Sequence, residues 1–297
     1  MEVIDWLLEG DPAIRWQTGR DLLNWPKELV HAQRAQVARD GWGRQLLDLQ
    51  DEAGTWGNGL YSPKWTSTTY TLLLLKRFGL TRHPAATRAV EILLDRGMTD
   101  EGGIDLSVTI GQPEVCVTSM VLALAATFVP HDERIATMAA FLIDRQLDDG
   151  AWNCEATSPQ AHGSLHTTIS ALEGLAAAGW GEVARSRAHA FLVHHRLYKS
   201  HRTGEVINPV FTRFSFPPRW HFDVLRCLDY LAQSGVDRHE EFSDAIALVR
   251  KKRRPEGTWL LQNTHPGRTF FVLEQNGQPS RWNTLRALRT LQWWESD

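Results

Sequence analysis

Cys116, Cys154 and His166 are side chains of metal-ligand type that lie within one short part of the sequence. Thiolate and imidazole groups suit Zn²⁺, and three protein ligands leave a fourth position open for water or substrate. The types of these residues therefore predict a Zn²⁺ site. Taken singly, a cysteine on an apolar helix is more often a small core residue, and we interpret Cys227 in that way. The Zn²⁺ prediction consequently depends on the fold bringing the ligands together.

His221 and Asp223 form a second set of candidates, because an imidazole beside a carboxylate can act as a general acid–base pair. Aromatic rings next to them could stabilise a cation. Asp223 could instead cap a helix or pair with Arg226. The candidates for lining a substrate cavity are Tyr61, Trp65, Trp220, Phe222, Trp282, Arg268 and Arg281.

A repeated triplet, glycine-any-large apolar, indicates the elements that must position these residues. It begins at glycines 54, 102, 150, 204 and 257, which are 48, 48, 54 and 53 residues apart. Glycine after an acid is a turn signal, and the apolar residue that follows can pack between neighbouring helices. The period of about 50 residues predicts a helix-pair repeat.

Each triplet is preceded by a charged, amphipathic stretch and followed by a stretch that is apolar on most sides. The first pattern predicts outer helices with one solvated face, and the second predicts buried inner helices. An earlier pair, 13–24 and 29–50, gives six inner helices, and residues 2–9 complete the outer ring. The sequence thus predicts one all-α domain over residues 1–297, an (α/α)6 toroid, with an open solenoid as the alternative.

In such a toroid the inner helices run parallel, so that their N-terminal ends meet around one mouth of the central cavity. Cys116 and His166 occupy equivalent positions at the starts of adjacent inner helices, and Cys154 lies in the loop between them. The loop 258–281 is longer than its counterparts. A long loop of this kind is either a functional lid or a segment packed over the core.

The segment Gln146-Leu-Asp-Asp-Gly-Ala-Trp152 resembles the repeat of squalene–hopene cyclases, and residues 49–56 form a looser copy. The resemblance extends over nearly the whole chain and implies the toroid of terpenoid cyclases and protein prenyltransferases. It says little about function, since one fold hosts many chemistries. The Asp-x-Asp-Asp acid of class II cyclases and the Asp-Asp-x-x-Asp motif of class I synthases are both absent. We therefore do not expect ordinary acid-initiated triterpene cyclisation.

The metal candidates resemble the zinc site of protein prenyltransferase β subunits, in which an acid-x-Cys pair opens one inner helix and a Tyr-His-Thr segment opens the next. The counterparts here are Glu114-Val-Cys116 and Leu165-His166-Thr167, so glutamate replaces aspartate and leucine replaces tyrosine. Cys154 is closer to the pattern of lanthionine cyclases, whose zinc has two cysteine ligands and one histidine. The resemblances imply a ligand set of Cys116, Cys154 and His166, or of Glu114, Cys116 and His166. His162 and His221 are further possible ligands.

Composition narrows the function classes. The chain of 297 residues has a formal net charge of −3 and a pI near 6.5, which argues against binding to nucleic acid. We expect no signal peptide and no membrane span, a cytoplasmic location, and thiols rather than disulfides.

These patterns together predict a zinc-dependent transferase or lyase that acts on an apolar, isoprenoid-like or thiol substrate at the barrel mouth. The alternative is a non-catalytic toroid that binds a peptide, a protein or another ligand and carries a structural zinc. A closed shell of four protein ligands would favour this alternative. The sequence leaves a partner subunit open.

Overall fold

The computed structural model describes residues 2–107, 110–155 and 161–296, and helices dominate it. The helices are α1 (Val3–Leu8), α2 (Pro12–Asp21), α3 (Lys27–Ala35), α4 (Gly41–Asp48), α5 (Thr68–Phe78), α6 (Pro84–Gly97), α7 (Val115–Phe128), α8 (Arg134–Asp144), α9 (Leu165–Ala178), α10 (Glu182–His194), α11 (Val224–Ser234), α12 (Ser243–Lys251) and α13 (Arg281–Glu295). Short 3₁₀ turns cover 36–38, 209–212 and 240–242. Two short antiparallel strands, β1 (Trp259–Leu260) and β2 (Pro279–Ser280), pair with each other.

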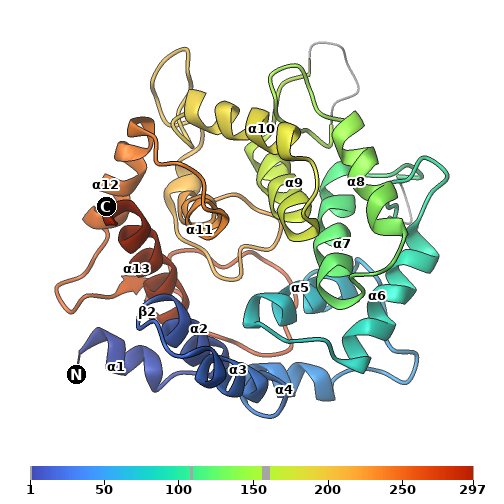
Figure 1. Cartoon of the computed structure of the whole chain (residues 1–297), viewed down its shortest axis with the longest axis horizontal. Coiled ribbons are helices and arrows are strands. Elements are labelled where there is room, and N and C mark those ends of the chain that lie inside the picture. The colour runs from blue at the N-terminus through green and yellow to red at the C-terminus, as the bar shows by residue number, and fades with distance from the viewer. Residues whose placement is uncertain (1, 108–109, 156–160, 297) are drawn as a thin grey trace.

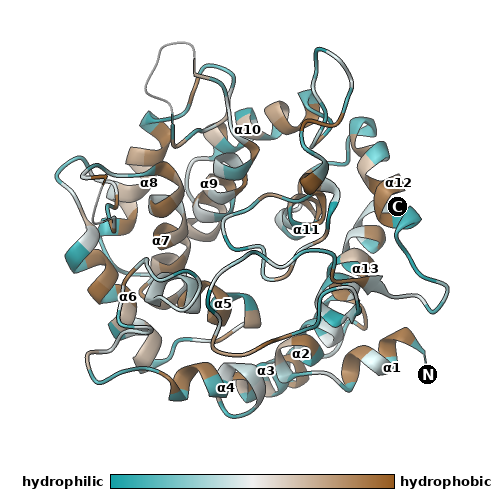
Figure 2. Cartoon of the chain, turned by 180° about the vertical axis from the view of Figure 1, so that it is seen from behind, coloured by the Kyte–Doolittle hydropathy of each residue, from teal (hydrophilic) through white to brown (hydrophobic). Residues whose placement is uncertain are grey.

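The helices form a closed ring around a centre that is crossed by loops (Figures 1 and 2). The inner helices are α2, α5, α7, α9, α11 and α13, and the others lie outside them. α7 is apolar along most of its length (Figure 2) and is buried on most sides. The Arg289 guanidinium of α13 forms an ion pair with Asp21 of α2, which closes the ring. The predicted all-α toroid is therefore confirmed, and the open solenoid is excluded.

Buried tryptophans connect three of the outer helices to the inner helix that follows. The indole Nε1 atoms of Trp56, Trp152 and Trp259 each donate a hydrogen bond of 2.7 Å to a carbonyl ten residues earlier in the chain. Their backbone amides donate to a threonine hydroxyl of the inner helix that follows. Ile104 keeps the bond to threonine without an indole. The repeat triplet thus holds together the outer helix before it, its own turn and the inner helix after it.

The glycine of the triplet is required by the backbone. Gly150 has φ +85°, and a Cβ placed on it would lie 2.7 Å from the carbonyl oxygen of Arg187. The fourth triplet departs from the prediction, because Val206 is 37% exposed. It forms an isolated bridge with Lys199 at the edge of the ring. The long segment that follows this turn, before α11, separates Val206 from the helix against which it would have packed.

One outer helix also differs from the sequence prediction. The stretch 29–50, expected as one outer helix, is divided into α3, a 3₁₀ turn and α4. Asp40 caps α4 by accepting from the Gly41 amide, so a new helix begins there. Within the described residues, no helix is both long enough and apolar enough to span a bilayer.

Candidate functional site

A cluster of aromatic and imidazole rings occupies the mouth at the N-terminal ends of the inner helices. The ring of His221 stacks on Trp220, with centroids 3.7 Å apart, and on His265, with centroids 3.8 Å apart. His166 contacts His221 edge-on at 5.8 Å, and Trp65 does so at 6.1 Å. The cluster therefore joins α9, the segment before α11, and the loops that contain Trp65 and His265.

The three imidazoles are neutral at physiological pH. Burial lowers the pKa of His166 to about 4, of His221 to about 3 and of His265 to about 4, and nearby cationic groups add to each effect. Nδ1 of His166 accepts a hydrogen bond of 2.8 Å from the Phe222 amide, which places its proton on Nε2. Nε2 of His265 is buried and has no hydrogen-bond partner among the described residues.

Cys116 at the start of α7 and Cys154 in the loop before α9 lie against each other. The Cys154 sulfur accepts from the Cys116 amide at 3.1 Å and from the Thr167 hydroxyl at 3.6 Å. The Cys116 thiol also hydrogen-bonds to this sulfur, which lowers the pKa of Cys154 and raises that of Cys116. Negative charge from Glu114 further raises the pKa of Cys116. The two thiols are thus chemically unequal.

These positions do not present a complete metal-ligand set. Residues 2–107, 110–155 and 161–296 contain no group of three or more histidine, cysteine, aspartate or glutamate side chains arranged to hold a metal ion. Cys116, Cys154 and Glu114 are neighbours, but His166 belongs to the imidazole cluster, and its free lone pair already accepts from a backbone amide. The side chain of His162 is exposed. The Zn²⁺ site stays a prediction, and no chemical step below depends on it.

Asp223 serves as the N-cap of α11. Its carboxylate accepts from the Arg226 amide at 2.8 Å and from the hydroxyl and amide of Ser215, and the residue is 1% exposed. No hydrogen bond joins it to His221 within the described part of the chain. The structure thus uses Asp223 in the capping role that the sequence offered as an alternative, and it provides no direct acid–base contact with His221.

A cavity of about 440 Å³ lies beside the ring cluster, under residues 264–276. Its wall includes Trp65, Phe216, Phe270 and Phe271, with His265 at its edge. The segment above it is fixed across the mouth, because the Trp65 amide donates to the Arg268 carbonyl at 2.7 Å and Arg268 donates back to Lys64 at 2.8 Å. The long loop therefore covers the cavity and is also hydrogen-bonded to the opposite rim.

Other predicted cavity residues have different positions. Tyr61 packs on Tyr70, and Phe222 is buried against Phe211. Trp282 stacks on Phe216, with centroids 4.4 Å apart, and does not line this cavity. The remaining candidates are Trp220, which belongs to the ring cluster, Arg268, which is exposed, and Arg281, whose Nε donates to the Trp6 carbonyl at 2.9 Å.

Arg219 lines the cavity and was not among the residues predicted to do so. It is 9% exposed, and its guanidinium lies 5.3 Å from the centroid of the Trp65 ring. Within the described residues no carboxylate forms an ion pair with it, and its side chain makes no hydrogen bond. Burial lowers its pKa to about 10, so it stays charged at neutral pH. His265 was also missed, because the loop that brings it to the cluster has no repeat pattern.

Comparisons with known proteins bear on the fold. No family model and no curated protein matches the sequence. Among solved structures, a protein from Actinoplanes is similar, with a TM-score of 0.51 and 18% identity over 96% of this chain and 90% of that chain. This likeness concerns the fold alone.

A type II terpene cyclase, MstE from Scytonema, is similar at a TM-score of 0.49 and 19% identity over 95% of this chain and 87% of that one. A variant of MstE in complex with geranylgeranyl dihydroxybenzoate gives 0.48, with the same identity and coverage. Likenesses at this level do not bear on what this chain binds or does.

Proposed function

We propose that this protein is an enzyme that binds an apolar, isoprenoid-like molecule carrying an anionic group in the cavity under residues 264–276. The observation that carries the proposal is an unpaired, buried cation, Arg219, in the wall of an aromatic cavity. Its volume of about 440 Å³ falls within the range of about 300–1,000 Å³ that small-molecule sites occupy.

The lining supports this choice of ligand. Phe216, Phe270, Phe271 and Trp65 offer apolar faces to a hydrocarbon chain. A buried guanidinium without a counter-ion is costly, and a carboxylate or phosphate on the ligand would relieve that cost through charge-assisted hydrogen bonds. The cavity therefore suits a molecule with a long apolar part and one anionic end.

The chemistry would take place beside the imidazole cluster. His265 lines the cavity, and burial lowers its pKa to about 4, so its imidazole is neutral. A neutral imidazole nitrogen in that position can accept a proton from the bound substrate and return it. We assign this proton transfer to His265, with His221 stacked behind it to fix the ring. The zinc dependence predicted from the sequence is a separate hypothesis.

A binding assay with two probes tests the anionic anchor. Farnesoic acid and farnesol share the hydrocarbon chain, and only the acid has a charge for Arg219. We expect Arg219→Met to weaken binding of the acid about tenfold or more and to change binding of the alcohol about twofold at most. The matched control is Arg213→Met, because Arg213 is exposed and does not line the cavity. Equal losses for both probes, or none, would contradict the anchor.

A turnover assay separates an enzyme from a binding protein. Prenyl acids and prenyl phosphates are incubated with the wild type and with His265→Ala, and the products are analysed by mass spectrometry. We expect product from the wild type, and from His265→Ala normal binding with little product. Tight binding without product from any of these substrates would contradict the enzyme and favour a non-catalytic toroid.

A further inference from the structure

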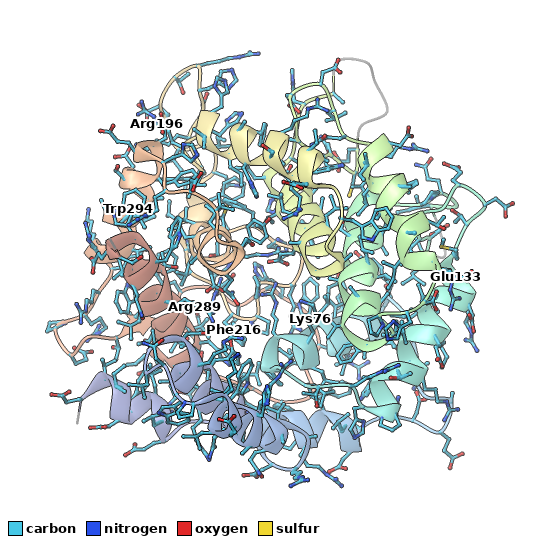
Figure 3. All side chains as sticks on the ribbon, in the orientation of Figure 1. Lys76, Glu133, Arg196, Phe216, Arg289 and Trp294 are labelled. Carbon is cyan, nitrogen blue, oxygen red and sulfur yellow. The ribbon has the colours of Figure 1, made fainter. Side chains whose placement is uncertain are left out.

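A second cavity of about 310 Å³ occupies the other half of the ring interior, toward the C-terminal ends of the inner helices. We call it the basic chamber. Seven basic side chains of the described residues line it: Arg20, Arg34, Lys76, Arg77, Arg226, Arg286 and Arg289. Phe216 lines both this chamber and the cavity under the mouth, and its ring stacks on Trp282, so these two rings separate the compartments. Figure 3 labels Lys76, Phe216 and Arg289 in the interior of the ring.

Carboxylates neutralise only part of this charge. Glu173 pairs with Arg77 at 3.2 Å and with Arg226 at 2.8 Å, and its pKa is held well below the usual range by these cations. Asp229 pairs with Arg289 at 2.7 Å. Together with Asp21 and Asp223, four carboxylates of the described residues face seven cations. If each carboxylate neutralises one cation, the chamber keeps an excess of about three positive charges.

The shortage of carboxylate partners is clearest at Arg286. It is 2% exposed, and its Nη1 donates to the Ser215 carbonyl at 2.9 Å. Its Nε and Nη2 atoms have no hydrogen-bond partner in the described part of the chain. The nearest carboxylates, Asp229 at 3.5 Å and Asp223 at 4.0 Å, are too far away for good hydrogen bonds. A buried guanidinium with two unsatisfied nitrogens is costly, and its charge adds to the positive potential of the chamber.

Lys76 adds a second cation without a partner. No ion pair or hydrogen bond of its ammonium group occurs within residues 2–107, 110–155 and 161–296. Burial lowers the pKa of Lys76 first of all, and the charges of Arg77 and Arg34 lower it further, against the opposing effect of Glu173. Arg34 itself donates only to the Gly79 carbonyl and lies over the ring of Trp16. The cations that lack carboxylate partners are thus grouped around the last turn of α5.

We propose that the basic chamber binds a phosphate or diphosphate group, with Lys76 among its ligands and the charge of Arg286 behind it. Several guanidinium groups and one ammonium converge there, and this set matches a compact polyanion with oxygens on several sides. A single carboxylate would leave most of the excess charge unpaired. The chamber shares none of its basic residues with the Arg219 cavity, so this site can be tested independently of the function proposed above.

Isothermal titration of the full chain with inorganic diphosphate, in buffer without phosphate, tests the site. We expect the wild type to bind diphosphate. The dissociation constant of Lys76→Met should be about tenfold or more higher, because the variant loses one charge-assisted hydrogen bond. The matched control is Lys251→Met, because Lys251 is exposed on outer helix α12 and lies outside the chamber. It should bind as the wild type does.

Thermal unfolding gives a second readout. Diphosphate should raise the midpoint of the wild type and of Lys251→Met but should raise that of Lys76→Met much less. Without the anion, Lys76→Met should be at least as stable as the wild type, because it loses a desolvated charge. A monoalkyl diphosphate that binds more tightly than inorganic diphosphate would identify an esterified ligand. Absence of diphosphate binding to the wild type, or equal binding by the two lysine variants, would overturn the proposal.

Discussion

Replacing Trp152 by phenylalanine tests whether the repeat triplet holds the ring together. The indole is fully buried, and its Nε1 donates 2.7 Å to the carbonyl of Leu142 near the end of α8. The Trp152 amide also bonds to Thr168 of α9, so this one residue connects an outer helix with the next inner helix. The substitution keeps an aromatic ring in place and removes the indole donor.

The expected decrease in the free energy of unfolding has two parts. A buried carbonyl at the end of α8 loses its partner, which costs about 1–3 kcal/mol. The smaller ring leaves a void of about 40 Å³, which at about 24 cal/mol per Å³ adds about 1 kcal/mol. We therefore expect Trp152→Phe to lower the free energy of unfolding by about 2–4 kcal/mol.

Urea unfolding, followed by circular dichroism, measures this loss. Trp180→Phe is the matched control, because Trp180 is 42% exposed and its indole donates no hydrogen bond within the described residues. It should change the free energy of unfolding by about 0.5 kcal/mol at most, as surface substitutions do. The same free energy for both variants would refute the view that the buried indole connects α8 with α9.

Three further outcomes can be checked. Because burial holds the pKa of His221 at about 3, the unfolded chain binds more protons below the usual histidine pKa of about 6.5. Stability should fall as pH drops from about 6.5 toward 4, and His221→Gln should flatten that slope in a series of thermal melts; a steeper slope would contradict it. With limiting iodoacetamide and peptide mass spectrometry, Cys154 should be alkylated before Cys227, whose pKa is raised by burial; the reverse order would contradict the thiol pair. Elemental analysis tests the zinc site predicted from the sequence: about one zinc per chain in the wild type, and less in Cys116→Ala and His166→Ala, would establish it, and zinc-free wild type, prepared without chelators, would rule it out.

The repeat made the fold predictable because its chemistry is local. Gly150 needs a positive φ, and Trp152 finds its carbonyl ten residues earlier and its threonine partner just beyond the turn, so every contact lies within one repeat. The repeat also predicted that Cys154, in the loop between two inner helices, shares a rim with Cys116, and the two residues are in contact. Val206 was wrongly expected inside because the same triplet there leads into a long segment instead of directly into a helix.

Much of the site lay beyond such reasoning. His265 reaches the mouth through a loop whose backbone carbonyl accepts from the Trp65 indole, 200 residues away in the chain. No short pattern encodes that contact. The absence of a partner for Arg219 is likewise a property of the assembled cavity, since a charged side chain in a sequence gives no sign of which carboxylates will surround it. His166 was placed on the correct rim, but its neighbours there are imidazoles.

The closure of the ring between α2 and α13 has a consequence for the newly made chain. The ion pair of Arg289 with Asp21 spans 268 residues, and the entropy lost on closing a loop grows with the logarithm of its length. During synthesis, α2 cannot meet α13 until the 268 residues that separate Asp21 from Arg289 have left the ribosome. Gln17, which already donates to the Arg77 carbonyl, meets Arg289 only then. The chamber is therefore complete only after α13 joins α2, and an anion bound in it would favour the closed ring over the open one.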